Sequence, residues 1–371
     1  MRLDPHHIKS RIRALRELRG WTQHELADIA SMSQPLISSL ENGTRTATFQ
    51  HVQTISQATG VPERFFVLEV EELTEAQLHF RKRRTAPTKS TRAVVRKFSE
   101  ARHLAKELAA TYRPKVELHP VKGAVDNNDI EEIALDVRSA LGFDDGPIKH
   151  AIRSCERAGF PVVMFGSEDG IVEDHCGVSY TDATGFGVIA ARTGQSGDQL
   201  RMTVGHELAH RLLHTFRDVP EKQREQEAFR LSGALFLPRD VALEELSDSL
   251  TLTGYARLKA AWGISIQALI MRAHALGAID DERRASLMRQ INRRGWRTDE
   301  PVEVGVERPA LLWHLLNQRF DKATYWRASE ELGFAQSDLM EWIPAQSRPA
   351  GEGQADVIRL DEVARRRAAR A

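Results

Sequence analysis

Hydrophobic residues near the N-terminus recur at the spacing of short amphipathic helices separated by brief turns. The first stripe ends at Gly20, and residues 22–25 have the form of a capping box that opens a second helix. Pro35 falls in the first turn of a third helix, where its missing N–H costs nothing, and a fourth helix ends at Gly60. The pattern predicts an all-α domain over residues 8–70.

The middle of the chain changes from helices to short apolar runs and back to helices. Three runs are typical of short strands, and they lie at 161–165, 177–180 and 186–191. The spacing of apolar residues predicts helices at 130–142, 148–158, 200–216 and 221–237, and helices dominate from 241 to 342. The sequence therefore predicts an α+β fold that is mainly α with a small β-sheet.

Length and composition bound the class of protein. The 371 residues are too many for one ordinary core, so we expect two or three domains. Lys and Arg number 52, and Asp and Glu number 52, so any nucleic-acid binding must come from a local patch. We find no apolar stretch approaching the roughly 18 residues of a membrane span, and no apolar signal segment. The two cysteines, Cys155 and Cys176, exclude a disulfide scaffold, and we expect a cytoplasmic chain with reduced thiols that does not bind membranes.

Residues 81–97 form a basic stretch with eight Lys and Arg and no acid. One interpretation is a solvated linker. The other is a basic arm that adds phosphate contacts to the neighbouring helical domain. Within the stretch, residues 84–92 are polar and contain Pro, so they are also a candidate exposed cleavage site.

The motif H-E-x-x-H at 206–210 carries the clearest chemistry. Residues four apart on a helix lie on one face, so the imidazoles of His206 and His210 can bind one Zn²⁺ ion. Glu207 can reach the water at the open coordination position and act as its general base. The motif indicates metal-assisted hydrolysis of a peptide bond.

A catalytic site of this kind needs a third ligand from the next predicted helix. Glu227 is the preferred candidate because it opens the apolar face that would pack on the motif's helix; Glu225 is the runner-up and Glu221 is weaker. His214 lies on roughly the same face as His210, but three ligands along one straight helix would span about 12 Å. We therefore expect His214 to be a neighbour of the ligands or a packed imidazole. Zn²⁺ is the expected ion, with Mn²⁺ as an alternative because one carboxylate joins two imidazoles.

The N-terminal segment carries the motifs TQHELA (22–27) and SQPLISSLENGTR (33–45), with a closing helix to Gly60. On these motifs, residues 8–68 resemble the Xre, or Cro/CI-type, phage-repressor helix-turn-helix. In that family the helix that starts near Gln34 lies in the major groove. The resemblance implies that Gln34, Pro35 and Ser39 face base edges. It implies phosphate contacts from Gln23, Asn42 and Arg45.

The central segment carries the motifs HELAHRLLH and EAFRLSGALFLP, preceded by the helices from residue 130. On these motifs, residues 130–238 resemble the ImmA/IrrE (DUF955-type) metallopeptidase family. The resemblance implies a zincin-like fold with Glu207 as the general base. It implies that the metal ligands are His206, His210 and Glu227.

Patterns and resemblances together give a division of the chain. We expect a helix-turn-helix domain at 8–70, a basic linker and helix at 71–129, a metallopeptidase domain at 130–240, a helical region at 241–345 and a disordered tail at 346–371.

Two functions use the same residues. In the first, a transcriptional regulator binds a double-stranded DNA operator and its zinc site cleaves a protein, such as a partner repressor. In the second, a regulator or antitoxin-like protein is not proteolytic and its metal site is structural or sensory. Glu207 favours the first, because a structural site needs no base beside its ligands. We favour a partner substrate over residues 84–92 of the chain itself, and a two-fold operator would require a homodimer.

Overall fold

The computed structural model describes residues 5–82, 88–166, 175–182, 184–321 and 325–345. The predicted disordered tail, 346–371, and residues 83–87 of the basic stretch lie outside these residues. The chain divides into two compact units, each assembled from several segments. The first contains 1–114, 159–194 and 309–345, and the second contains 115–158 and 195–308. The units alternate along the chain and do not follow the predicted boundaries after residues 129 and 240.

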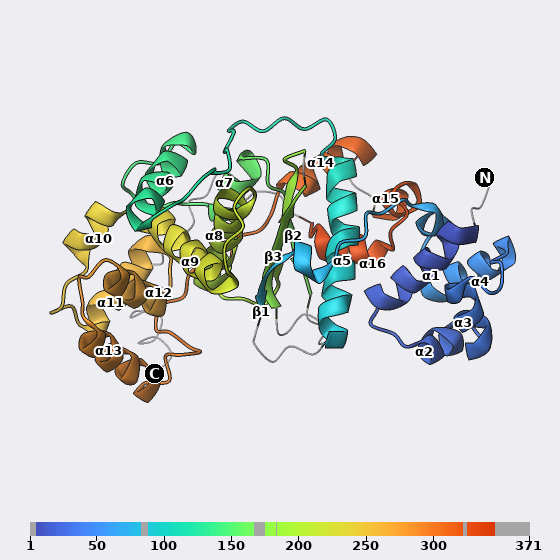
Figure 1. Ribbon diagram of the computed structural model, residues 1–371, viewed down its shortest axis with the longest axis horizontal. Helices are drawn as coiled ribbons and strands as arrows, with labels where there is room; N and C mark the ends of the chain where they lie inside the picture. Colours follow the sequence, from blue (N-terminus) through green and yellow to red (C-terminus); the bar gives the residue numbers. More distant parts are fainter. Residues whose placement is uncertain (1–4, 83–87, 167–174, 183, 322–324, 346–371) are drawn as a thin grey trace, which may run out of the picture. The chain divides into compact units, whose positions relative to one another are not determined.

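The first unit begins with the predicted all-α module (Figure 1). Its helices are α1 (Pro5–Leu18), α2 (Gln23–Ile29), α3 (Gln34–Asn42), α4 (Phe49–Thr59) and the 3-10 helix η1 (Glu63–Val67). The Thr22 side chain accepts a hydrogen bond from the Glu25 N–H, and the Glu25 carboxylate accepts one from the Thr22 N–H. The predicted capping box is therefore confirmed. Gly43 ends α3 at a φ of 75°, a left-handed conformation that favours glycine.

A four-stranded sheet follows in the same unit, in the order β1-β3-β4-β2. The strands are β1 (His79–Lys82), β2 (Val162–Phe165), β3 (His175–Thr181) and β4 (Gly187–Arg192). The β1–β3 and β3–β4 pairs are antiparallel, whereas β2 and β4 are parallel. The three predicted strands are confirmed. The fourth, β1, was missed because it runs into the basic stretch and lacks an apolar run.

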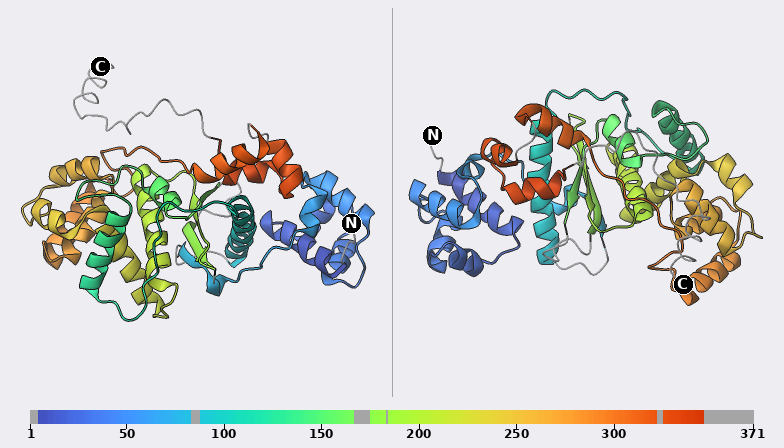
Figure 2. Two further views of the ribbon diagram at one scale, coloured as in Figure 1. Left: turned by 90° about the horizontal axis from the view of Figure 1, so that it is seen from above. Right: turned by 180° about the vertical axis from the view of Figure 1, so that it is seen from behind.

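Helix α5 (Thr88–Leu108) shows that the linker interpretation is wrong for residues 88–97. Val94 and Phe98 have no exposed surface and join a core that includes the buried strand residue Val188. In both views of Figure 2, α5 lies along the sheet. The sequence pattern missed the first half of this helix because Arg96 and Lys97, which the basic stretch suggested were solvated, are buried in ion pairs.

These pairs connect α5 to several elements of the first unit. Arg11 of α1 donates two hydrogen bonds to Glu100 of α5, at 2.6 and 2.9 Å, and both side chains are buried. Lys97 pairs with Glu341 of α16 (Gln336–Trp342) at 2.7 Å. Since Lys97 is held in this pair, it is not part of a basic arm. The remaining helices of the unit are η2 (Glu75–Gln77), α14 (Leu311–Phe320) and α15 (Tyr325–Leu332).

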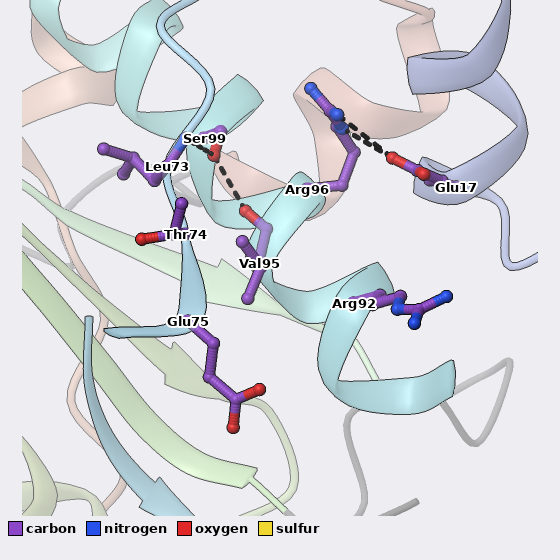
Figure 3. A pocket seen from close by; sticks show the side chains of 8 residues that line it. All are labelled: Glu17, Leu73, Thr74, Glu75, Arg92, Val95, Arg96 and Ser99. Carbon is purple, nitrogen blue, oxygen red and sulfur yellow. Dashed lines mark hydrogen bonds and ion pairs between the residues drawn. The ribbon is translucent and has the colours of Figure 1, made fainter. Parts of the chain in front are cut away.

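A small pocket of about 200 Å³ lies between α1, the segment before β1 and α5 (Figure 3). Arg96 donates to Glu17 at 3.0 Å on one side. On the other side, the Ser99 hydroxyl accepts from the Leu73 N–H at 3.3 Å and donates to the Val95 carbonyl at 2.9 Å. The volume is below the roughly 300–1,000 Å³ of typical ligand sites, so this is a packing gap.

The second unit contains helices and no strands among its described residues. Its helices are α6 (Asn127–Ala140), α7 (Ala151–Arg157), α8 (Gly197–His214), α9 (Glu221–Phe236), α10 (Arg239–Glu245), α11 (Leu252–Trp262), α12 (Ile266–Ala275) and α13 (Asp281–Arg293). Every residue of α8 except Gln199 is buried, and α9 packs along it. The mainly α fold with a small sheet is as predicted. No helix among the described residues is long and apolar enough to cross a bilayer.

Gly205 allows α8 and α9 to approach closely. A Cβ atom at this position would lie 2.6 Å from Cε2 of Phe236 and 2.8 Å from Oγ of Ser232, both on α9. Real Cβ contacts are not this short, so a larger side chain at this position would have to displace Phe236 and Ser232 or shift one helix against the other. By contrast, a Cβ at Gly233 of α9 would meet only Cδ of Arg272, at 3.4 Å.

We expect Gly205→Ala to lower the free energy of unfolding by about 1–3 kcal/mol, because overpacking outweighs the better helix propensity of alanine. Gly233→Ala is the matched control, and it should be neutral or stabilise by up to about 1 kcal/mol. Chemical denaturation of both variants measures the difference. Equal free energies of unfolding in the two variants would show that Gly205 is not needed for the helix packing.

Candidate metal centre

Three side chains from α8 and α9 bring metal-ligating atoms together. The Nε2 atoms of His206 and His210 are 3.0 Å apart, because a four-residue spacing places both imidazoles on one face of α8. The Glu225 carboxylate of α9 lies 3.3 Å from His206 Nε2 and 3.2 Å from His210 Nε2. All three ligand atoms fall within 4.8 Å of one another.

The chemistry and spacing of these donors fit a divalent ion. Two ligand atoms held tetrahedrally at roughly 2.0–2.1 Å from one Zn²⁺ are roughly 3.3 Å apart, close to the separations found here. Two neutral imidazoles and one carboxylate are also the ligand types of catalytic zinc sites. Both imidazoles are fully buried, whereas one third of the Glu225 side chain is exposed. The cluster is therefore enclosed on the α8 side and reachable at Glu225.

Electrostatics keeps Glu225 ionised. Burial raises the pKa of its carboxyl group, but the hydrogen bonds that it accepts from His206 and His210 in the absence of a metal hold that pKa well below its usual range. An ionised carboxylate at neutral pH is the form that binds a metal ion.

Glu227 does not lie with the two imidazoles, in contrast to the sequence expectation. Its carboxylate accepts hydrogen bonds from Arg217, at 2.8 and 3.2 Å, and from Gln223 at 2.8 Å. Residues two apart on a helix are rotated by about 200°, so Glu225 and Glu227 cannot both face the same point. Glu225, the runner-up, occupies the place that was expected for Glu227.

His214 joins Glu227 to the cluster. His210 Nδ1 lies 3.1 Å from His214 Nδ1, and His214 Nε2 lies 3.1 Å from the Glu227 carboxylate. Burial and the charge of His210 lower the pKa of His214 to about 4, despite the nearby Glu227 carboxylate. In the neutral tautomer that donates from Nε2 to Glu227, His214 Nδ1 accepts a hydrogen bond from the Nδ1–H of His210. The lone pair of His210 Nε2 then points to the cluster.

Glu207 and Phe229 complete the surroundings of the cluster. Glu207 follows His206 on α8, is fully buried, and is not one of the three clustered donors. The Phe229 ring centroid lies 4.5 Å from that of His206, yet almost half of its surface is exposed. This exposed apolar side chain beside His206 was not predicted from the sequence.

In the helix-turn-helix, two of the predicted DNA-contacting residues bond to each other. Gln34 Nε2, at the start of α3, donates to Gln23 Oε1 at 2.9 Å, and Gln23 Nε2 donates to Glu41 at 3.0 Å. Arg16 also pairs with Glu41, at 2.6 Å. The network fixes the relative position of α2 and α3, and both glutamines remain partly exposed.

The other four predicted contacts lie along α3 and just beyond it. Pro35, Asn42 and Arg45 are exposed. Ser39 is partly exposed, and its hydroxyl donates to the Leu36 carbonyl at 2.8 Å. The structure thus places all six predicted residues at least partly on the surface of one helical module.

Comparisons with known families agree with this arrangement. Residues 12–66 match a family described as helix-turn-helix. Residues 155–274 match a peptidase family described as an IrrE N-terminal-like domain, a span that includes α8 and α9. A search of curated proteins finds no match. The chain therefore joins an N-terminal DNA-binding helix-turn-helix domain to a peptidase domain of the IrrE N-terminal-like family.

Proposed function

We propose that this DNA-binding regulator uses its peptidase domain as a zinc-dependent endopeptidase that cleaves a protein partner. The observation that carries the proposal is the cluster of His206, His210 and Glu225. Glu207, the residue after His206 on α8, is buried. The two imidazoles and Glu225 hold the metal, which is Zn²⁺ or, as the donor set also allows, Mn²⁺.

When bound, the ion supplies Lewis acidity toward a carbonyl group and a water molecule. Glu207 accepts a proton from the attacking water, whose oxygen forms the new bond to the peptide carbonyl carbon. The C–N bond then breaks, and Glu207 returns the proton to the leaving amine. Atoms balance as the addition of one water across the peptide bond.

Two observations favour hydrolysis over a structural or sensory site. Structural zinc sites are closed by four protein ligands, whereas three clustered donors leave a position open for water or substrate. The partial exposure of Glu225 gives that position access from outside. The substrate is a partner protein in trans, since residues 88–92 of the candidate internal cleavage site are part of helix α5 and are not extended.

The donor assignment predicts different effects for two neighbouring glutamates. Glu225→Gln should lose most bound metal, because a ligand is removed. Glu227→Gln should keep one ion per chain with roughly 10- to 100-fold weaker affinity, as expected for a residue that orients a ligand. Metal content and titration against a competing chelator measure both. Loss of metal in Glu227→Gln with full retention in Glu225→Gln would reverse the assignment.

Catalysis is tested separately from metal binding. Glu207→Gln should retain the metal but cleave a neighbouring regulator at least 10²-fold more slowly, because a general base typically contributes 10²–10⁴-fold. The readout is the intact mass of the regulator after incubation with metal-loaded protein. Equal cleavage by Glu207→Gln and the unmodified protein would exclude Glu207 as the base. No cleavage of any neighbouring regulator would favour the non-proteolytic alternative.

The DNA-binding part of the proposal rests on Gln34 at the start of α3. Gln34→Ala should alter the preferred operator sequence and cost about 1–3 kcal/mol at the affected base pair. Gln50→Ala, an exposed glutamine on α4, serves as the control and should leave the preference unchanged. Selection of preferred duplexes from a random pool gives both results. An unchanged preference in Gln34→Ala would remove Gln34 from base recognition.

A further inference from the structure

A dense run of arginines lies at α13 and the turn after it. Residues 283–298 contain six arginines and no acid, although acids and bases balance over the whole chain. Four of these arginines are exposed. We call them the α13 arginine surface: Arg289, Arg293, Arg294 and Arg297.

The exposed four differ from the arginines that hold the second unit together. Arg272 and Arg201 are buried and pair with carboxylates, as in the Arg272–Glu131 pair at 2.6 Å. Arg283 and Arg284, at the start of the run, also have acidic partners. Within the described part of the chain, none of the exposed four forms an ion pair. Ion pairs within the described structure therefore do not explain why four arginines lie here.

The helix and its ending hold this surface in place. Leu287 and Ile291 are buried and anchor the inner side of α13, whereas Arg289 lies about 200° around the helix from Leu287, on the outer side. After the helix, the Trp296 N–H donates to the Ile291 carbonyl at 3.1 Å. The Arg294 guanidinium stacks over the partly exposed Trp296 ring at 5.0 Å.

Stabilisation of the helix dipole explains only part of the cluster. Cations in the last turn of a helix interact favourably with its C-terminal carbonyls, and the effect falls off within that turn. This accounts for Arg293 and for Arg294, the residue that caps α13. Arg289 lies before the last turn and Arg297 lies beyond the end of the helix.

We propose that the α13 arginine surface binds the phosphate backbone of duplex DNA, as a contact separate from the helix-turn-helix and independent of sequence. Guanidinium groups pair with phosphate oxygens through two parallel hydrogen bonds and keep their charge at any physiological pH. The choice of DNA as the partner rests on the proposed DNA-binding function. That this surface binds a partner at all is inferred from its four arginines, which form no ion pair within the described residues.

The test is the salt dependence of binding by the full chain to a short duplex of arbitrary sequence. Replacing all four arginines of the surface with glutamine should flatten the plot of log affinity against log salt concentration by about 0.9 for each lost phosphate contact, up to roughly 3.6 for four. Replacement by lysine should largely restore the slope. The matched control replaces four exposed basic residues from other parts of the unit with glutamine: Lys115, Arg153, Arg239 and Arg257.

The outcomes separate this proposal from the one for α3. A slope in the glutamine variant equal to that of the unmodified chain, or an equal loss in the control set, overturns the α13 surface. An unchanged slope is also the result expected if the arginines bind an acidic protein and not DNA. Gln34→Ala tests base recognition and should leave the slope on arbitrary duplex nearly unchanged. If the unmodified chain binds no duplex even at low salt, both proposals fail while the peptidase proposal stands. Thermal unfolding confirms that each variant is folded.

Discussion

The close packing of α8 against α9 at Gly205 is the constraint on which the candidate metal centre depends. Without a side chain at Gly205, Phe236 and Ser232 of α9 can lie directly against α8. This approach brings a carboxylate of one helix to the imidazoles of the other, which neither helix can achieve alone. The arrangement of the three candidate ligands is thus a property of the helix pair, and it depends on Gly205, which is not one of them.

The same helix pair explains why two glutamates so close in sequence have different surroundings. Glu225 faces His206 and His210, whereas Glu227 faces His214 and Arg217. Arg217 forms an ion pair with Glu227. Because His214 donates a hydrogen bond to the Glu227 carboxylate, its other ring nitrogen accepts one from His210. A buried acid beside a metal ligand fixes the ring orientation and tautomer of the ligand and increases its basicity. In the proposed centre, Glu227 therefore acts on the ligand His210 through His214.

Local sequence patterns predicted most of the helices and the spacing of the histidine pair, because both depend on interactions between residues close in sequence. The capping box at Thr22 and the four-residue spacing of His206 and His210 depend only on helix geometry, and both were predicted. The choice between Glu225 and Glu227 depends on the rotation of α9 against α8, which tertiary packing sets. Helix α5 was missed in part because its basic residues looked solvated, whereas Lys97 is paired with a residue 244 positions away.

The most direct test of the metal centre is the position of the ion itself. Anomalous diffraction at the zinc absorption edge, from crystals of the zinc-loaded protein, locates the metal without reference to activity. We expect one peak bounded by His206 Nε2, His210 Nε2 and a Glu225 oxygen, each at roughly 2.0–2.2 Å from the ion. A peak between His214 and Glu227, with Glu225 turned away, would contradict it.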